Sequence, residues 1–141
     1  MQIREMSLKE LEEIYSVVKQ LRSELTYEAF EDLIYDMRHM EYKMLGVMER
    51  GRLITYAGVA VQTNLYHKRH LYVFDLVTDS AYRGEGYGKA MLAYLVDFAN
   101  LSMCENIVLS SGFAREDAHR FYERDGYEKR SFLFVKSLQR D

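Results

Sequence analysis

Residues 71–94 read LYVFDLVTDSAYRGEGYGKAMLAY, and they combine a strand, a glycine-rich turn and the start of a helix. Residues 71–77 are rich in aromatic and β-branched side chains, which is typical of a strand. From Gly86 onward, apolar residues recur at intervals of three and four, the period of an amphipathic helix. They are Met91, Leu92, Leu95, Val96 and Phe98. The strand is therefore expected to meet the helix through residues 83–88.

This turn has the character of an anion site. The first backbone N–H groups of a helix have no intrahelical acceptor, and the helix dipole places positive charge there. Two common phosphate motifs do not fit, however. A dinucleotide fingerprint needs glycine at position 89, which is Lys89, and a P-loop needs Ser or Thr at position 90, which is Ala90.

A different pattern does fit. Arg83, Gly86 and Gly88 match Arg/Gln-x-x-Gly-x-Gly/Ala directly after a strand. Downstream, a predicted strand at 106–110 is followed by residues 118–127, AHRFYERDGY, which match Ala-x-x-Phe-Tyr-x-x-x-Gly-Phe/Tyr. In both motifs and in their order the chain resembles the GNAT superfamily of acyl-CoA N-acyltransferases. The residues within the motifs are similar to those of a histone/polyamine-acetyltransferase-like branch.

The resemblance implies an α+β fold of three layers (α/β/α), with a mixed, mostly antiparallel central sheet and helices on both faces. It also implies that residues 1–141 form a single N-acetyltransferase domain. The local patterns agree with this layout. Ser7 and Glu10 form a capping box for a helix to Leu21, and Thr26 caps a second helix to about Met40. Strands are predicted at 2–6, 43–49, 52–62 and 127–136, with a turn at Arg50-Gly51.

Composition narrows the class of protein. A length of 141 residues suits one domain with a real core, and a net charge of −3 argues against nucleic acid as the main ligand. No apolar run is long enough to span a membrane, and the N-terminus lacks the apolar core of a signal peptide, so a cytoplasmic protein without a membrane partner is expected. The single cysteine, Cys104, is expected to be a small core residue.

The resemblance implies acetyl-CoA as co-substrate, no metal, and a small-molecule or protein amine as acceptor. Tyr122 matches the family's general acid. A phenol has a pKa of about 10 and a thiol about 8.5, close enough for the phenol to protonate a leaving thiolate. The alternative to a role as general acid is that Tyr122 is an aromatic residue packed in the core. Asp75 is the candidate base, but Phe74 stands where relatives often carry a glutamate, so Asp75 could instead anchor substrate or serve as a hydrogen-bond partner at the strand end.

The cofactor-binding residues also follow from the resemblance. Leu76 and Val77 are expected to contact the pantetheine arm and thioester oxygen through backbone N–H groups. The pyrophosphate loop comprises Arg83, Gly84, Glu85, Gly86, Tyr87, Gly88 and Lys89. For His119 and Arg115 two interpretations remain: a role in the site, or an ordinary surface position.

The acceptor is less defined. The second predicted helix carries acidic residues on its outer face, namely Glu28, Glu31, Asp32 and Asp36, with Glu24 just before it. They favour a polyamine-like or other cationic amine if they line the acceptor site, and otherwise form a solvated face. Two functions are compatible with the sequence: an N-acetyltransferase that transfers directly within a ternary complex, and a non-catalytic acyl-CoA-binding domain of the same fold. Many relatives are dimers, which makes a homodimer compatible too.

Overall fold

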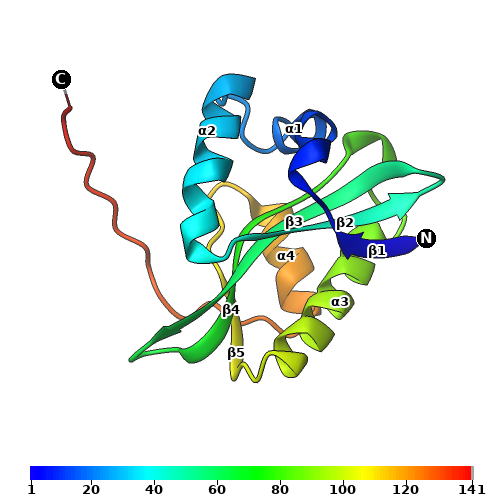
Figure 1. Ribbon diagram of the computed structural model, residues 1–141. Helices are drawn as coiled ribbons and strands as arrows, with labels where there is room; N and C mark the ends of the chain where they lie inside the picture. Colours follow the sequence, from blue (N-terminus) through cyan, green and yellow to red (C-terminus); the bar gives the residue numbers. More distant parts are fainter. Residues whose placement is uncertain (141) are drawn as a thin grey trace. The chain divides into compact units, whose positions relative to one another are not determined.

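A five-stranded sheet organises the first 109 residues (Figure 1). Its strands lie in chain order, β1-β2-β3-β4-β5. They are β1 (Gln2–Glu5), β2 (Lys43–Glu49), β3 (Arg52–Asn64), β4 (Lys68–Thr78) and β5 (Asn106–Leu109). The first four strands pair antiparallel, and β5 pairs parallel with β4. The mixed, mostly antiparallel sheet expected from the sequence is confirmed.

The computed structural model describes residues 1–140. The chain divides into two units, Met1–Leu109 and Ser110–Asp141. The first unit holds the sheet, α1 (Leu11–Val18), α2 (Tyr27–Met37), α3 (Tyr87–Leu101) and three short 3₁₀ turns: η1 (Leu8–Glu10), η2 (Arg38–Met40) and η3 (Ser80–Tyr82). The second unit holds α4 (Glu116–Arg124).

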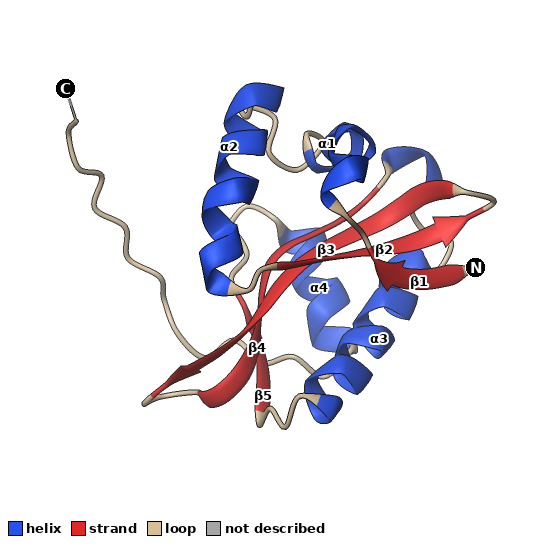
Figure 2. Ribbon diagram, in the orientation of Figure 1, coloured by secondary structure: helices blue, strands red, loops and turns tan. Residues whose placement is uncertain are grey.

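Within the first unit, helices cover both faces of the sheet. Figure 2 shows α1 and α2 on one face and α3 on the other. The helices begin where the sequence predicts. Ser7 and Glu10 form the reciprocal capping box, and the Thr26 hydroxyl accepts a hydrogen bond from the Ala29 N–H at 3.2 Å. These caps direct the chain across the sheet and place the apolar faces of α1 and α2 against it.

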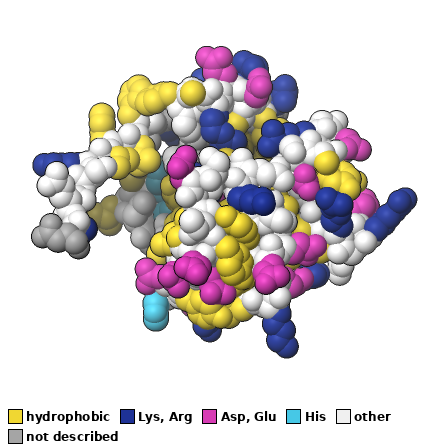
Figure 3. All heavy atoms as spheres, turned by 90° about the horizontal axis from the view of Figure 1, so that it is seen from above, with side chains coloured by type: hydrophobic (Ala, Val, Ile, Leu, Met, Phe, Trp, Pro, Cys, Tyr) yellow, Lys and Arg dark blue, Asp and Glu magenta, His cyan; other side chains and the backbone are white. Residues whose placement is uncertain are grey.

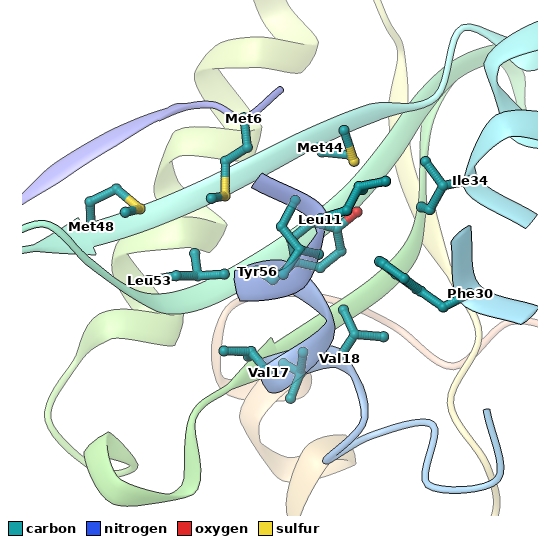
Figure 4. Packing of buried hydrophobic residues seen from close by; sticks show 12 residues of the cluster. Met6, Leu11, Val17, Val18, Phe30, Ile34, Met44, Met48, Leu53 and Tyr56 are labelled. Carbon is teal, nitrogen blue, oxygen red and sulfur yellow. The ribbon is translucent and has the colours of Figure 1, made fainter. Parts of the chain in front are cut away.

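The core between α1, α2 and the sheet is built from residues of all three elements (Figure 4). Leu11, Ile14 and Val18 of α1 and Phe30 and Ile34 of α2 are buried there. From the sheet come Met44, Met48, Leu53, Tyr56 and Val77. Burial of this much apolar surface is the main stabilising contribution to the first unit.

Several boundaries differ from the prediction. The expected helices to Leu21 and Met40 are each divided into an α-helix and a 3₁₀ turn. Val96 is exposed rather than inward, and Cys104 is half-buried rather than a core residue, with its thiol pKa raised by partial burial. The Arg50-Gly51 turn is confirmed, since both residues have the positive φ angles of a tight hairpin.

The strand predicted at 127–136 is wrong. From Asp125 to Arg140 the described chain contains neither helix nor strand. The prediction relied on an alternating apolar sequence, but a strand also needs a neighbour to accept its backbone hydrogen bonds. No such pairing is formed by these residues.

Candidate active site

The site begins where β4 loses one of its two neighbours. Pairing with β5 covers only His70–Val73 of β4, whereas pairing with β3 continues to Thr78. Residues 74–78 therefore have an open edge on the side of β5. A bulge lies at the same place, because Gly58 pairs with Asp75 and Val59 with Val73, which leaves Phe74 as the extra residue. Leu76 and Val77, predicted to act through their backbone, both lie in this open stretch.

The glycine-rich turn follows the open stretch directly. Gly84 and Gly86 have φ angles of +80° and +89°, and Gly86 is the N-cap of α3 without any side-chain cap. The first helical bond runs from the Ala90 N–H to the Gly86 carbonyl at 3.0 Å, so the amides of the first three helical residues precede it. A Cβ added to Gly84 or Gly86 would meet no atom within 4 Å. The turn thus presents accessible backbone donors and the positive end of a helix dipole, which suits a phosphate.

The side chains of this turn have separate partners. The Arg83 Nε donates to the Thr78 carbonyl at 3.3 Å, which ties the turn to the end of β4. The Tyr87 hydroxyl donates to Glu49 Oε2 at 3.2 Å, and partial burial, followed by Glu49, raises the pKa of this phenol. Glu85 and Lys89 are exposed. Tyr87 therefore points its side chain at β2 and can serve a ligand at the turn only through its backbone.

Asp75, the candidate base, is already engaged on both carboxylate oxygens. Its Oδ1 accepts hydrogen bonds from Arg22 Nε at 3.1 Å and Arg22 Nη2 at 3.0 Å, and its Oδ2 accepts one from the Tyr42 hydroxyl at 2.8 Å. The second donor of the Arg22 fork also reaches the Phe74 carbonyl at 2.9 Å, at the bulge. Both oxygens of the Asp75 carboxylate are therefore already occupied by donors of this chain. The contacts favour the third role considered for Asp75, a hydrogen-bond partner at the strand end.

Two phenols extend the hydrogen bonds of Asp75, the half-buried Tyr42 and the buried Tyr56. The hydroxyls of Tyr42 and Tyr56 lie 2.8 Å apart. Since the single Tyr42 proton is donated to Asp75, the Tyr56 hydroxyl donates to Tyr42. Burial raises the pKa of both phenols well above the ordinary value, so both stay protonated donors at neutral pH.

Gly58 makes this arrangement possible. A Cβ at Gly58 would lie 1.6 Å from the Tyr42 hydroxyl oxygen. Only glycine allows the phenol to cross β3 and reach Asp75. Sequence reasoning missed Arg22, Tyr42, Tyr56 and Gly58 as parts of this cluster. An isolated glycine within a strand is a known signal for a bulge or close approach, so Gly58 could have been found, whereas Arg22 gave no signal.

Tyr122 belongs to the second unit. It lies on the last turn of α4, is 8% exposed, and packs against Phe121 and Tyr127 with ring centroids 5.5 and 5.8 Å away. The Tyr127 hydroxyl is buried and has no hydrogen-bond partner among the described residues; burial raises its pKa to about 12. Tyr122 is thus held in an aromatic cluster with a fixed ring orientation.

His119 and Arg115 also lie in the second unit. The His119 Nε2 donates to the Gly112 carbonyl at 2.8 Å, which ties α4 to the loop before it. Arg115 precedes α4 and is exposed. The contact of His119 is structural, and among the residues described no group of three or more potential ligands is arranged for a metal ion. Nor does the described chain contain a helix of the length and apolarity that a membrane crossing requires.

Comparison with known proteins decides the family. Residues 7–127 match the acetyltransferase (GNAT) family, which spans both units. The chain belongs to the GNAT family. It is therefore an acetyl-CoA-dependent N-acetyltransferase, and the family uses acetyl-CoA as acetyl donor. The more specific histone/polyamine branch suggested by the sequence motifs is not supported by these matches.

Three similar proteins illustrate the range of the family. The chain is 33% identical to the uncharacterized N-acetyltransferase YhdJ of Bacillus subtilis over 134 residues, 94% of each protein. It is 28% identical to the aminoalkylphosphonate N-acetyltransferase of Salmonella typhimurium, over 97% of this chain and 91% of the relative. The aminoglycoside N-acetyltransferase AAC(6')-Iy, solved in complex with CoA, has the same fold with a TM-score of 0.83 at 14% identity, over 98% of this chain and 94% of that one.

Proposed function

We propose that this GNAT enzyme transfers an acetyl group directly from acetyl-CoA to a primary amine of a small molecule or a protein, with both substrates bound together. The observation that carries the proposal is the open edge of β4 from Phe74 to Thr78, which leads into the uncapped glycine turn before α3. Acetyl-CoA supplies the activated thioester; the protein must bind it, polarise its carbonyl and manage protons.

The open edge and the glycine turn are proposed to bind different parts of acetyl-CoA. Successive N–H groups of a strand point to opposite edges, so one of Leu76 and Val77 offers its N–H at the open edge, to the pantetheine arm or the thioester oxygen. Fixed donors at this oxygen would stabilise the negative charge that develops when the amine attacks. The glycine turn and the N-terminus of α3 offer further N–H groups to the pyrophosphate, with Arg83 and Lys89 adding positive charge.

Tyr122 is proposed as the general acid that protonates the departing CoA thiolate. Its place in a motif of the family supports this role, and its packing against Phe121 and Tyr127 would hold the phenol in one orientation. Asp75 is assigned a different role. Its contacts with Arg22 and Tyr42 fix the bulge of β4, and removal of the amine proton is assigned to a water path or another residue.

Two acceptor classes have support. The acidic side chains on the outer face of α2, with Glu28, Asp32 and Asp36 exposed, favour a cationic, polyamine-like amine. Figure 3, viewed from the side of α1 and α2, shows acidic and basic side chains intermixed on this face. The half-exposed Arg22 guanidinium at the bulge favours instead an amine that also carries an acidic group, the class on which the Salmonella relative acts by name. The two classes separate cleanly in a substrate panel.

The test is release of CoA thiol from acetyl-CoA in the presence of polyamines, aminoalkylphosphonates, amino acids, amino sugars and basic peptides. One amine class is expected to raise release far above hydrolysis. Tyr122→Phe is expected to lower kcat about 100-fold or more, with acetyl-CoA affinity unchanged. Tyr127→Phe is the matched control, because it removes an unpartnered hydroxyl from the same cluster and leaves kcat unchanged.

Near-full turnover of Tyr122→Phe would remove Tyr122 from the mechanism. If acetyl-CoA binds but no amine raises thiol release, the transfer to a free amine is not the reaction. Equal loss in Tyr122→Phe and Tyr127→Phe would assign both effects to packing.

A further inference from the structure

The connection between β4 and the glycine turn, residues 79–83, begins with a residue that fixes its direction. Asp79 caps the 3₁₀ turn η3, because its Oδ1 accepts a hydrogen bond from the Ala81 N–H at 3.1 Å. The Asp79 carbonyl accepts a second one from the Tyr82 N–H at 2.9 Å, and the Asp79 N–H donates to the Ile54 carbonyl of β3 at 2.8 Å. Asp79 therefore sets the path on which the chain leaves the sheet toward Gly84.

Asp79 is also a charged residue with little access to water. It is only 9% exposed, and a carboxylate buried to this extent needs charged or hydrogen-bonding partners. Arg52, the first residue of β3, supplies the opposite charge, since its Nη2 lies 3.7 Å from Asp79 Oδ2. The Arg52 guanidinium also lies over the Tyr82 ring, 5.6 Å from the ring centroid. Arg52 thus contacts both the cap and the last residue of η3.

A residue from a distant part of the chain binds the same connection. Gln20 lies just beyond the end of α1. Its Oε1 accepts a hydrogen bond from the Ser80 N–H at 2.8 Å, and its Nε2 donates to Asp79 Oδ1 at 3.4 Å. Both ends of one amide group therefore hold two adjacent residues that are 60 and 59 positions away in the sequence. Gln20 itself is exposed, so the apolar core does not depend on it.

The glycine turn depends on what holds its two ends. A Cβ added to Gly84 or Gly86 would meet no atom within 4 Å, so side-chain packing does not fix the turn at these positions. One end of the turn is held by α3, and the other by residues 79–83. Backbone donors bind an anion most tightly when they are already in place before the anion arrives, because binding then costs less conformational entropy. The contacts of Gln20 and Asp79 supply this preorganisation.

We propose that Gln20 and Asp79 are positioning residues for acetyl-CoA, and that they hold residues 79–83 so that the backbone donors of the glycine turn face the diphosphate. The inference rests on the proposed function, in which this turn binds the pyrophosphate. Both side chains act through the backbone of the connection and contact no part of the cofactor. Their loss therefore weakens binding of the diphosphate and leaves binding of the thioester arm unchanged.

The first test compares two ligands. Calorimetry measures the Kd of acetyl-CoA, and a titration followed by ligand-observed NMR measures the Kd of S-acetylpantetheine, which has the same thioester arm without the diphosphate. Gln20→Ala is expected to raise the Kd of acetyl-CoA about fivefold and to leave that of S-acetylpantetheine unchanged. An unchanged Kd for acetyl-CoA would overturn the proposal. So would an equal loss of affinity for both ligands, which would indicate a general disturbance of the fold.

Ser16→Ala is the matched control for this comparison. Ser16 is exposed and lies one turn before Gln20, and its hydroxyl donates to the Glu13 carbonyl, so the hydrogen bond that is lost stays within α1. Both dissociation constants are expected to keep their native values. A loss of acetyl-CoA affinity equal to that of Gln20→Ala would assign the effect to α1 and not to the contact with residues 79–83.

The second test uses a conservative variant and a reference variant. Asp79→Ala is expected to weaken acetyl-CoA binding more than Gln20→Ala does, whereas Asp79→Asn keeps an oxygen for the Ala81 N–H and retains most of the affinity. Equal losses in the two Asp79 variants would contradict the role of the cap. Circular dichroism checks that each variant folds, and Gly86→Ala, which changes the turn itself, is the reference. If Gly86→Ala weakens acetyl-CoA binding and Gln20→Ala does not, the positioning role is wrong and the pyrophosphate site stands. If neither does, both are wrong.

Discussion

The two halves of β4 differ in one respect. His70–Val73 are paired on both sides, with β3 and with β5, whereas Phe74–Thr78 are paired only with β3. The first half carries the buried residues Leu71 and Val73 and serves as scaffold. The second half carries an open backbone edge, a bulge and a carboxylate held by an arginine and a phenol. The same strand is thus closed where it supports the sheet and open where a ligand can form backbone hydrogen bonds.

This difference depends on the cluster at the bulge. Arg22 binds both the Asp75 carboxylate and the Phe74 carbonyl, directly after Val73, the last residue of β4 that pairs with β5. Tyr42 reaches the other carboxylate oxygen of Asp75, Oδ2, through the space that Gly58 leaves. The open half is therefore held by side chains in place of a second strand. Changes to these side chains test the comparison.

The largest effect is expected for Gly58→Ala. The added methyl group would collide with the Tyr42 hydroxyl and displace it from Asp75, with a cost of about 4 kcal/mol in the free energy of unfolding from overpacking and lost hydrogen bonds. Urea unfolding measures it. In the Tyr42→Leu background the same substitution should cost much less. Gly112→Ala is the control, since a Cβ there meets nothing within 4 Å. Equal costs in both backgrounds would show that Gly58 and Tyr42 are not coupled.

A smaller effect is expected for Tyr42→Phe. The ring stays, but Asp75 Oδ2 loses its donor and the Tyr56 hydroxyl loses its acceptor, at a cost of about 2 kcal/mol. Tyr27→Phe removes a longer bond, 3.3 Å to Glu31 on α2, and should cost under about 0.5 kcal/mol. Thermal unfolding of the two variants under the same conditions compares the two losses of stability. Similar losses would mean that the cluster at the bulge is no stronger than a surface contact.

The third prediction concerns the affinity for acetyl-CoA as well as the stability of the fold. Gly86→Ala forces an L residue to a φ of +89° at the start of α3, and displacement of one amide donor is expected to weaken acetyl-CoA binding about tenfold. Gly51→Ala imposes similar strain, φ +75°, in the β2–β3 turn, with equally open surroundings. Calorimetry should show weaker binding only for Gly86→Ala. Unchanged binding would exclude the turn as the pyrophosphate site.

The smallest effect lies at the opposite edge of the sheet. The hydrogen bond from Arg4, followed by the Ser7 N–H, lowers the pKa of Glu10 from 4.5 to about 2. Because the folded-state pKa is depressed, the stabilisation is present above about pH 5 and is lost as the pH falls toward 2. Glu10→Gln should cost about 1 kcal/mol at pH 7 and progressively less as the pH falls through about 2, with acetyl-CoA binding unchanged. A pH-independent loss would contradict the assignment.

Sequence reasoning succeeded where a structure depends on nearby residues. The capping box of Ser7 and Glu10, the Thr26 cap and the Arg50-Gly51 turn are all set within four residues, and each is confirmed. The glycine turn and the strand before it were also located correctly. The apolar period of α3 placed most of its buried positions.

Prediction failed where partners come from distant residues. The contacts of Asp75 with Arg22 and Tyr42 join residues 53 and 33 positions apart, and no local pattern encodes them. The Phe74 bulge likewise depends on the register with β3. Residues 132–135 are a further example. Their sequence favours a strand, but whether a strand forms depends on a neighbouring strand.

Hydrogen exchange of β4 with and without acetyl-CoA tests the central claim most directly. Saturating acetyl-CoA is expected to slow exchange in peptides covering residues 75–77, where the edge is open, and to leave peptides covering 71–73 unchanged. Peptides covering residues 84–89 of the glycine turn should also gain protection. If acetyl-CoA binds while residues 75–77 exchange as before, the open half of β4 is not the cofactor edge.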